Sequence, residues 1–169
     1  AADFRGLKIR SSGSMLDYLA AAGAAPQFVP GSELYQALSS GVVDGAHWGA
    51  AIGAQSMSLW EVCKYHYKPV LAQTTDAFIM NIDALEALPT DLRGALEEIV
   101  TTRFFLRSAE YQHKEAIALA EGIEKDGIEV VQLPDDVLEL LATASATILE
   151  TEGQKGERAA KAADIYRTL

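Results

Sequence analysis

Short apolar runs alternate with amphipathic stretches along the first third of the chain. Residues 7–10 and 27–29 have the composition of short strands, and a third strand leads into residues 46–48. Between them, residues 14–22 and 33–39 place apolar side chains on one helical face, and each stretch ends at a glycine. This strand–helix–strand–helix–strand order predicts a parallel sheet with helices packed against it.

The pattern changes in the middle of the chain. A helix of small residues is expected over 50–62, and residues 65–72 and 76–81 have an extended pattern. Residues 76–81 are apolar on both faces, which is typical of a central strand buried on both sides. From Thr90 the chain can remain helical to about Asp126. Such a helix would be about 50 Å long, more than a compact domain of this size needs, so we expect it to bridge two bodies.

The last part of the chain repeats the alternation once. Residues 128–133 predict a strand and residues 135–152 a helix, and a short final helix carries Ile165 and Tyr166. The fold class that we expect is therefore α/β.

The composition fits an acidic globular protein. Of 169 residues, 49% are hydrophobic and 22% charged, and the formal net charge is −10. That charge disfavours nucleic acid as a partner, because phosphate binding requires clustered Lys and Arg. No apolar run approaches the roughly 20 residues that cross a bilayer, and the first residues have no features of an export signal. Composition thus leaves open a cytosolic protein and a mature or truncated part of an exported one.

Residues that could support catalysis or hold a metal are sparse. The histidines His47, His66 and His113 lie too far apart in sequence for a helical metal motif. The single cysteine, Cys63, is expected to be a packing residue, and Glu110 with His113 a solvated pair on a helix. An enzyme has little support, and its remaining form is an α/β enzyme with His47 as general base.

Two segments next to strand ends have the composition of a ligand site. Arg10 ends the first strand, and in parallel sheets ligands bind beyond the carboxyl ends of strands. A guanidinium there suits a carboxylate, because the two form parallel hydrogen bonds, although a surface salt bridge is its other possible role. His47 and Trp48 follow another strand among glycines, where the Trp48 ring can line a binding site or pack in the core.

Several segments together resemble a known family. They are Phe4-Arg5-Gly6-Leu7-Lys8-Ile9-Arg10, Gly23 with Pro26, Glu33-Leu34-Tyr35-Gln36-Ala37-Leu38, Gly41-Val42-Val43-Asp44-Gly45, Phe78-Ile79-Met80-Asn81 and Leu88-Pro89-Thr90-Asp91-Leu92. In this combination the chain is similar to the DctP-type solute-binding subunits of tripartite ATP-independent periplasmic (TRAP) transporters. Members of that family are considerably longer, and the resemblance covers their C-terminal portion.

The resemblance implies a partial Venus-flytrap periplasmic binding-protein fold, type II-like, with the second lobe, crossing strands and a long helix that spans both lobes. Residues 1–74 would be the ligand-binding part of the second lobe. Residues 75–112 would be a crossing strand and long helix belonging partly to the first lobe, and residues 113–169 the remainder of the second lobe. The implied function is capture of a small organic acid in the periplasm for the membrane subunits of a TRAP transporter, without catalysis.

The resemblance also implies roles for four residues. Arg10 would clamp the substrate carboxylate, and Trp48 would be the second ligand-contacting side chain, as in receptors for 2-oxo or hydroxy acids. Those receptors commonly carry Glu before the tryptophan, where it helps to hold a metal ion. Here that residue is His47, and because Na⁺ and Ca²⁺ prefer oxygen ligands we expect no cofactor, with a Na⁺ or Ca²⁺ ion associated with the substrate as the alternative. Gln73, in the stretch that crosses between lobes, is expected to reach the cleft.

Two further expectations concern partners. In the family, residues 76–81 and the first turns of the long helix belong to a lobe mostly outside this chain. Their apolar surface predicts that the isolated chain associates as a homodimer. The alternative function is an extracytoplasmic sensor or interaction module built on the same lobe.

Overall fold

The first strands and helices form the parallel layer that the alternating pattern predicts. In the computed structural model, which describes residues 1–72 and 77–168, β1 is the middle strand of a three-stranded sheet and is parallel to both neighbours. Its strands are β1 (Ile9–Ser11), β2 (Gln27–Phe28) and β3 (Gly45–Ala46). The connections contain α1 (Ser14–Ala21), a 3₁₀ turn η1 (Gly31–Glu33) and α2 (Leu34–Ser39). The carboxyl ends of all three strands therefore lie at one edge of the sheet.

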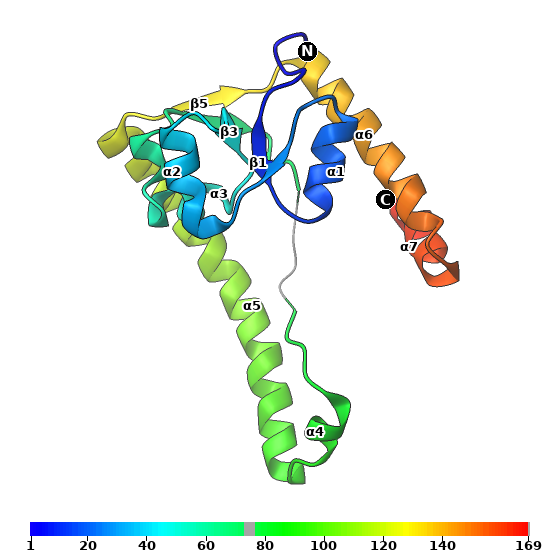
Figure 1. The fold of residues 1–169 in the computed structure, drawn as a ribbon. Helices are drawn as coiled ribbons and strands as arrows, with labels where there is room; N and C mark the ends of the chain where they lie inside the picture. The colour runs from blue at the N-terminus through cyan, green and yellow to red at the C-terminus, as the bar shows by residue number, and fades with distance from the viewer. Residues whose placement is uncertain (73–76, 169) are drawn as a thin grey trace.

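A second parallel pair and two helices complete the body of the molecule (Figure 1). β4 (Tyr65–Lys68) pairs with β5 (Glu129–Gln132), which confirms both predicted strands. α6 (Asp135–Gly153) packs against α1, and α7 (Glu157–Arg167) folds back along α6. No helix among residues 1–72 and 77–168 has the length and hydrophobicity needed to cross a bilayer.

The predicted helix over residues 50–62 is interrupted. α3 (Ala50–Ser56) ends before Ser58, whose φ of 53° lies in the left-handed region, and a 3₁₀ turn η2 (Leu59–Glu61) follows. The interruption turns Leu59 and Trp60 into the core, where both are buried. The prediction of one continuous helix was wrong because burial of these two side chains outweighs helical continuity.

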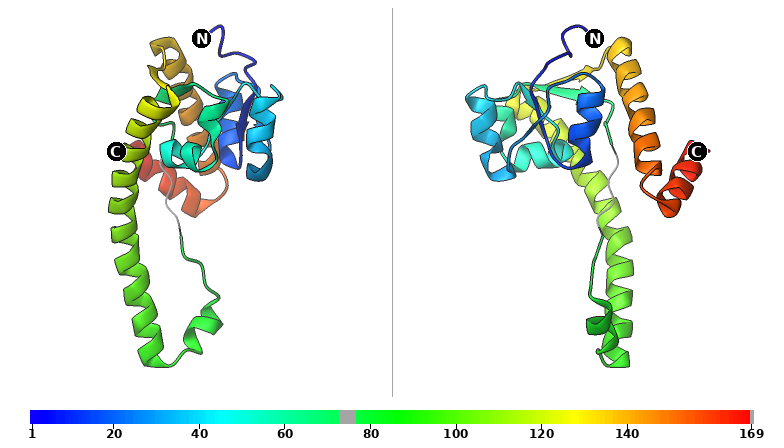
Figure 2. Two further views of the ribbon diagram at one scale, coloured as in Figure 1. Left: turned by 90° about the vertical axis from the view of Figure 1, so that its left-hand side faces the viewer. Right: turned by 45° about the vertical axis from the view of Figure 1, so that its right-hand side comes forward.

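The long helix is confirmed. α5 (Thr90–Glu121) has 32 residues, which corresponds to about 48 Å, and continues into a single π-helical turn, η3 (Gly122–Asp126). Its C-terminal half packs on the body, and its N-terminal half projects away with the short helix α4 (Ile82–Glu86) at the tip (Figures 1 and 2). We call residues 77–107, which form this projection, the stalk.

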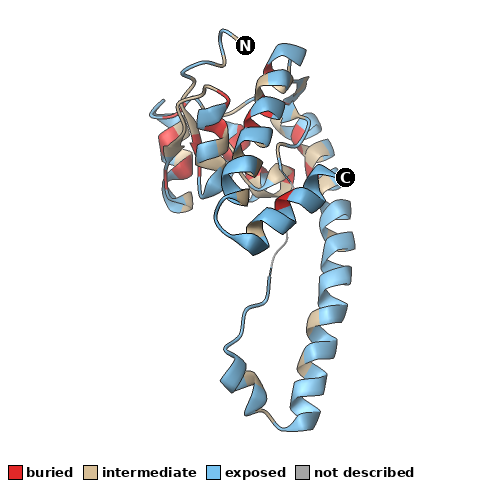
Figure 3. Ribbon diagram, turned by 90° about the vertical axis from the view of Figure 1, so that its right-hand side faces the viewer, coloured by how far each residue is buried: buried red, intermediate tan, exposed pale blue. Residues whose placement is uncertain are grey.

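The stalk is largely exposed (Figure 3), and many of its exposed side chains are large and apolar. Ile79 is 91% exposed, Phe78 71% and Phe105 68%. The other large apolar side chains exposed there are Met80, Ile82, Leu92, Ile99, Phe104 and Leu106. A strand over 76–81 was predicted, but residues 77–81 form none, and Asp76 lies outside the described residues. Their apolar pattern on both faces requires neighbouring strands, and the described strands pair only with one another.

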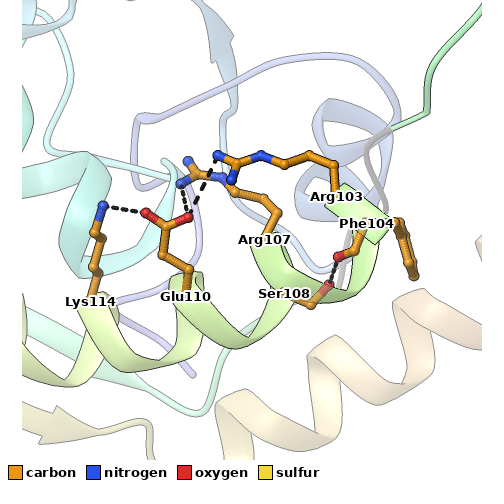
Figure 4. Close-up of polar contacts among 6 residues, drawn as sticks. All are labelled: Arg103, Phe104, Arg107, Ser108, Glu110 and Lys114. Carbon is orange, nitrogen blue, oxygen red and sulfur yellow. Dashed lines mark hydrogen bonds and ion pairs between the residues drawn. The ribbon is translucent and has the colours of Figure 1, made fainter. Parts of the chain in front are cut away.

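Charged residues line one face of α5 between the stalk and the body. The Glu110 carboxylate accepts a hydrogen bond from Lys114 Nζ and forms ion pairs with Arg107 and Arg103 (Figure 4). The Nη atoms of Arg107 and Arg103 lie 3.5 and 3.6 Å from Glu110 Oε2. The hydrogen bond from Lys114, together with the three positive charges, lowers the pKa of Glu110. Glu110 thus pairs with cations on its own helix rather than with His113, with which it was expected to form a solvated pair.

The core of the body has two main clusters. One joins α1 to α6 through Leu19, Val137 and Leu141. The other joins α2, α3, η2 and α5 through Leu34, Ala51, Ala54, Trp60 and Ala118, with Trp48 packed at its margin. At Gly122 a Cβ atom would lie 2.5 Å from the Trp60 ring, so the end of α5 can approach the core only with glycine there.

Candidate functional site

The Arg10 side chain joins the carboxyl ends of two strands. The residue is 5% exposed, its Nε donates to the Val29 carbonyl oxygen at 2.8 Å, and its Nη1 donates to the His47 carbonyl oxygen at 3.2 Å. Burial lowers the pKa of the guanidinium. These bonds use two of the five N–H donors and hold the guanidinium plane in place. The Nη2 hydrogens and the second hydrogen of Nη1 donate to no further partner among the described residues, and these remaining donors suit a carboxylate.

The Trp48 ring lies against the Arg10 guanidinium. The Arg10 Cζ atom is 4.6 Å from the ring centroid, within the range of a cation–π interaction. Two glycines make room for the ring. A Cβ atom at Gly31 would lie 2.7 Å from Cη2 of the indole, and one at Gly53 would lie 3.0 Å from Cδ1. The ring is therefore held between η1 and α3 with Arg10 on its face.

His47 connects β3 to β1. Its backbone N–H donates to the Arg10 carbonyl oxygen at 2.8 Å, and its Nδ1 lies 3.4 Å from the Oγ of Ser11, which is fully buried. Burial, and secondarily the positive charge of Arg10, lowers the pKa of the His47 imidazole. The imidazole is thus kept neutral to a lower pH than an ordinary histidine.

A tight turn links Trp48 to α3, and α5 holds it. The Ala50 N–H donates to the Trp48 carbonyl oxygen at 2.9 Å, which makes an inverse γ-turn at Gly49, and Ala50 itself has a φ of 56°. From α5, the Tyr111 hydroxyl donates to the Gly49 carbonyl oxygen at 3.1 Å. The half-buried Glu115 carboxylate accepts from the Ala51 and Ile52 N–H groups at 2.8 and 3.0 Å.

The structure brings together three of the four residues that the sequence predicted. Arg10, His47 and Trp48 meet at the carboxyl edge of the three-stranded sheet, whereas Gln73 lies outside the described residues. Within residues 1–72 and 77–168, no cluster of three or more His, Cys, Asp or Glu side chains is arranged to hold a metal ion.

Sequence reasoning missed other members of this site. They are Ser11, which contacts His47, Gly31, which admits the Trp48 ring, and Tyr111 and Glu115 on α5. Gly31 carried a detectable signal, because a glycine directly after Pro30 is compatible with close packing as well as with a turn. Glu115 is more than sixty positions from its partners, so no local sequence pattern predicts that it caps α3.

Comparison with known proteins assigns this arrangement to a family. Residues 1–155 match the model of the bacterial extracellular solute-binding proteins, family 7 (DctP). A monocarboxylate 2-oxoacid-binding periplasmic protein of Nostoc sp. is 23% identical over 156 residues, covering 90% of this chain and 42% of that protein. The C4-dicarboxylate-binding periplasmic protein DctP of Rhodobacter capsulatus is 37% identical over 98 residues, covering 57% of this chain and 29% of that protein.

A solved structure supports the same assignment. A TRAP transporter solute-binding protein of Bordetella bronchiseptica, a dimer with calcium and picolinate bound in one active site, superposes with a TM-score of 0.79 and 27% identity. The match covers 95% of this chain and 48% of that one. The chain therefore spans less than half the length of each of these three proteins.

Proposed function

Because the chain belongs to the bacterial extracellular solute-binding proteins of family 7, we propose that it is the part of a periplasmic receptor that captures a small organic acid for a TRAP transporter. Its fold is the portion of a two-lobed solute-binding protein that the sequence predicted, and its mixed α/β body has parallel sheets throughout. The family and fold are those of binding proteins that perform no chemistry. The three proteins named above are solute-binding proteins, and they give no support to the alternative of a sensor or interaction module.

The observation that carries this proposal is the fixed Arg10 guanidinium. Two backbone carbonyls orient it at the strand edge, and the described residues place no carboxylate against it. A buried cation with directed, unused donors is electrostatically suited to a carboxylate, and Trp48 beside it supplies an apolar face for the rest of a small acid. The proposed ligand-binding residues are Arg10, Trp48 and His47, and Gln73 stays a prediction.

The ligand class follows from the same residues together with the relatives. The named relatives bind 2-oxo monocarboxylates or C4-dicarboxylates, and the structural neighbour carries picolinate. All of these ligands have a carboxylate, to which Arg10 would donate hydrogen bonds. The 2-oxoacid-binding relative aligns with nearly the whole chain. We therefore place a 2-oxo or hydroxy acid first among the candidates.

A resident cation fits poorly with the side chains at this site. The structural neighbour holds calcium with its ligand. Here the side-chain donors beside Arg10 and Trp48 are the His47 imidazole and the Ser11 hydroxyl, and the buried Arg10 charge repels a cation. Because Na⁺ and Ca²⁺ prefer several oxygen ligands, we propose that carboxylate capture relies on Arg10 without a metal ion.

We also propose the lobe boundaries predicted at residues 74–75 and 112–113, of which the first lies outside the described residues. Residues 1–72 and 113–168 lie in the body, and the stalk extends away from it (Figure 2). In the proposed receptor, the ligand bridges this body and a second lobe that covers the stalk, so ligand binding shifts the population toward a closed form. The membrane subunits of a TRAP transporter are the proposed partners, and we propose that the isolated chain dimerises.

A thermal-shift assay on the full-length protein tests the proposed function. Pyruvate, succinate and picolinate, each at millimolar concentration, are compared with the corresponding neutral amides. A carboxylate that binds only the native state raises the melting temperature, and a matched amide that lacks the charge does not. Equal shifts with acids and amides, or no shift with any small acid in a wider panel, would contradict capture by Arg10.

A further inference from the structure

The site contains one feature that carboxylate capture alone does not explain, which is the attachment of α5 to the turn after Trp48. Gly49, the residue that precedes α3, has no side chain to cap that helix. The N–H groups of Ala51 and Ile52 are capped instead by Glu115, 64 and 63 positions away. Tyr111, one helical turn before Glu115, binds the Gly49 carbonyl oxygen.

These contacts fix the position of the Trp48 ring through α3. The ring lies against Gly53, so a displacement of the first turn of α3 moves one wall of its pocket. The Gly53 N–H also donates to the Gly49 carbonyl oxygen at 2.9 Å, which makes Gly49, Gly53 and Tyr111 one hydrogen-bonded unit. The other wall, Gly31, belongs to η1, and the described residues give η1 no hydrogen bond to α5.

The same helix that makes these contacts forms the stalk. α5 is continuous from Thr90 to Glu121, with the exposed apolar residues of the stalk at one end and Tyr111 and Glu115 nearer the other (Figure 1). Sharp kinks in helices arise at Pro, at Gly/Ser pairs or at π-bulges, and α5 contains no proline and is continuous between the stalk and Glu115, so a displacement of its stalk end is carried toward Tyr111 and Glu115. Whatever covers the stalk is therefore mechanically connected to Trp48.

We propose that Glu115 and Tyr111 are positioning residues for the Arg10–Trp48 pair: they clamp the turn 49–52, and through it the Trp48 ring, to the helix that carries the stalk. The consequence for ligand affinity rests on the proposed function. Glu115 sets the position of Trp48 whether or not a ligand is bound.

Fluorine NMR of the full-length protein labelled with 5-fluorotryptophan tests the inference directly. We expect Trp48 and Trp60 to give separate resonances, which Trp48→Phe and Trp60→Phe assign. We expect Glu115→Ala to shift or broaden the Trp48 resonance and to leave that of Trp60, which is buried in the core and reports on intact folding, in place. Tyr111→Phe, which removes only the hydroxyl, should move Trp48 in the same direction by a smaller amount.

Glu121→Ala is the matched control. Glu121 is also an α5 carboxylate that bridges to α3, since it accepts from Gln55 Nε2 at 2.9 Å, but it does so at the end of α3 remote from Trp48. We expect this variant to leave both resonances unchanged. A Trp48 resonance that stays in place in both Glu115→Ala and Tyr111→Phe, or that moves equally in Glu121→Ala, would overturn the inference.

Affinity for pyruvate, measured by calorimetry, is the second readout. Glu115→Ala should weaken binding about tenfold or more, the effect of losing charge-assisted hydrogen bonds that orient a contact residue, and Glu121→Ala should not. If the wild-type protein binds no pyruvate, the choice of ligand fails while the NMR result still decides the role of Glu115. If the Trp48 resonance moves and pyruvate affinity is unchanged, the proposed coupling to ligand binding is wrong.

Discussion

The Arg10 guanidinium carbon lies 4.6 Å from the centroid of the Trp48 ring, although Arg10 belongs to β1, where it is the middle residue rather than the last as predicted, and Trp48 follows β3. The parallel pairing of β1 with β3 places Arg10 opposite Ala46, so the chain needs only two further residues to bring Trp48 over the guanidinium. The sheet therefore sets the register of the two proposed ligand contacts, and the turn after Trp48 completes their placement. Rigid placement of this kind reduces the ordering cost of binding.

Replacement of Arg10 tests the carboxylate clamp. In the full-length protein, Arg10→Lys should reduce ligand affinity by about 2–4 kcal/mol, because a point charge cannot replace a planar fork with two parallel donors. Calorimetry with the best acid from the thermal-shift panel measures the change. Arg5→Lys, a conservative change elsewhere on the same body, should bind like the wild type. Unchanged affinity in Arg10→Lys would exclude Arg10 as the clamp.

The space around the Trp48 ring gives a second prediction. Gly31→Ala introduces a Cβ atom 2.7 Å from the indole, so the ring must move or the turn must shift, at a cost of about 1–3 kcal/mol in unfolding free energy. Ligand affinity should fall as well, because Trp48 leaves its position over Arg10. Gly45→Ala lies in β3 near the same residues with nothing within 4 Å of its Cβ, and chemical denaturation should show it to be much milder.

The fold was largely predictable from the sequence because its short-range signals agree. The strand–helix alternation, the glycine stops and the unbroken stretch after Thr90 each report local structure, and the parallel sheet follows from their order. The grouping of Arg10, His47 and Trp48 could be predicted as well, because the carboxyl ends of strands in a parallel sheet meet at one edge.

The wrong or missing predictions all depend on partners distant in sequence. Residues 77–81 have the composition of a buried strand, but a strand requires a neighbour that the described residues do not supply. Ser58 interrupts a helical pattern because Trp60 has to reach the core. Glu115 caps a helix 63 positions away, and a glutamate on a long helix otherwise looks like any solvated residue.

The lowered pKa of His47 predicts how the protein responds to pH. Burial and Arg10 keep the imidazole neutral in the folded state, whereas in the unfolded chain it is protonated below its ordinary pKa of 6.5. The free energy of unfolding is therefore highest, as far as His47 is concerned, above pH 6.5, and it decreases as the pH falls below 6.5 because the unfolded chain takes up the proton more readily. A bound carboxylate would offset the Arg10 charge and raise the pKa of His47, so ligand affinity should increase as the pH falls through the same range.

Two histidine variants separate these effects. His47→Gln should remove the pH dependence of ligand affinity in calorimetry between pH 5 and 7.5, the range in which histidines titrate. The pKa of His66 is also lowered by burial, but this residue lies in β4 beside Trp60, away from Arg10. His66→Gln should therefore change only the pH dependence of stability. A pH dependence of affinity that persists in His47→Gln would contradict this assignment.

The backbone at Ala50 predicts a stabilising substitution. A φ of 56° is unfavourable for a residue with a Cβ atom, so Ala50→Gly should raise the unfolding free energy by about 0.5–1 kcal/mol after the entropy of the extra glycine is counted. Ala54→Gly, in the interior of the same helix and buried, should lower it by about 1 kcal/mol. Chemical denaturation of both variants distinguishes them by sign. Destabilisation in Ala50→Gly would mean that this residue does not hold the left-handed conformation.

The stalk predicts association of the isolated chain. Its large apolar side chains are exposed. A groove of about 360 Å³ lies between the segment 77–81 and α5 and is lined by Phe78, Val100, Thr101, Phe104 and Phe105. Burial of even four such side chains contributes on the order of 6–12 kcal/mol, which is comparable to the roughly 4–15 kcal/mol that association costs. We expect a two-fold dimer in which the stalks cover one another, because a self-complementary contact closes at two copies.

Light scattering and sedimentation of the 169-residue chain at micromolar concentration measure this association. Ile79→Lys should shift the chain to monomer without loss of stability, because Ile79 is 91% exposed and makes no core contact to lose. Ile165→Lys is the matched control, since Ile165 is 55% exposed on α7 at the opposite part of the body, and it should leave the dimer intact. Equal dissociation in both variants would place the interface elsewhere. A wild-type chain that stays monomeric and melts cooperatively would show that the exposed stalk does not drive self-association, and the apolar surface would then serve contacts within the full-length receptor alone.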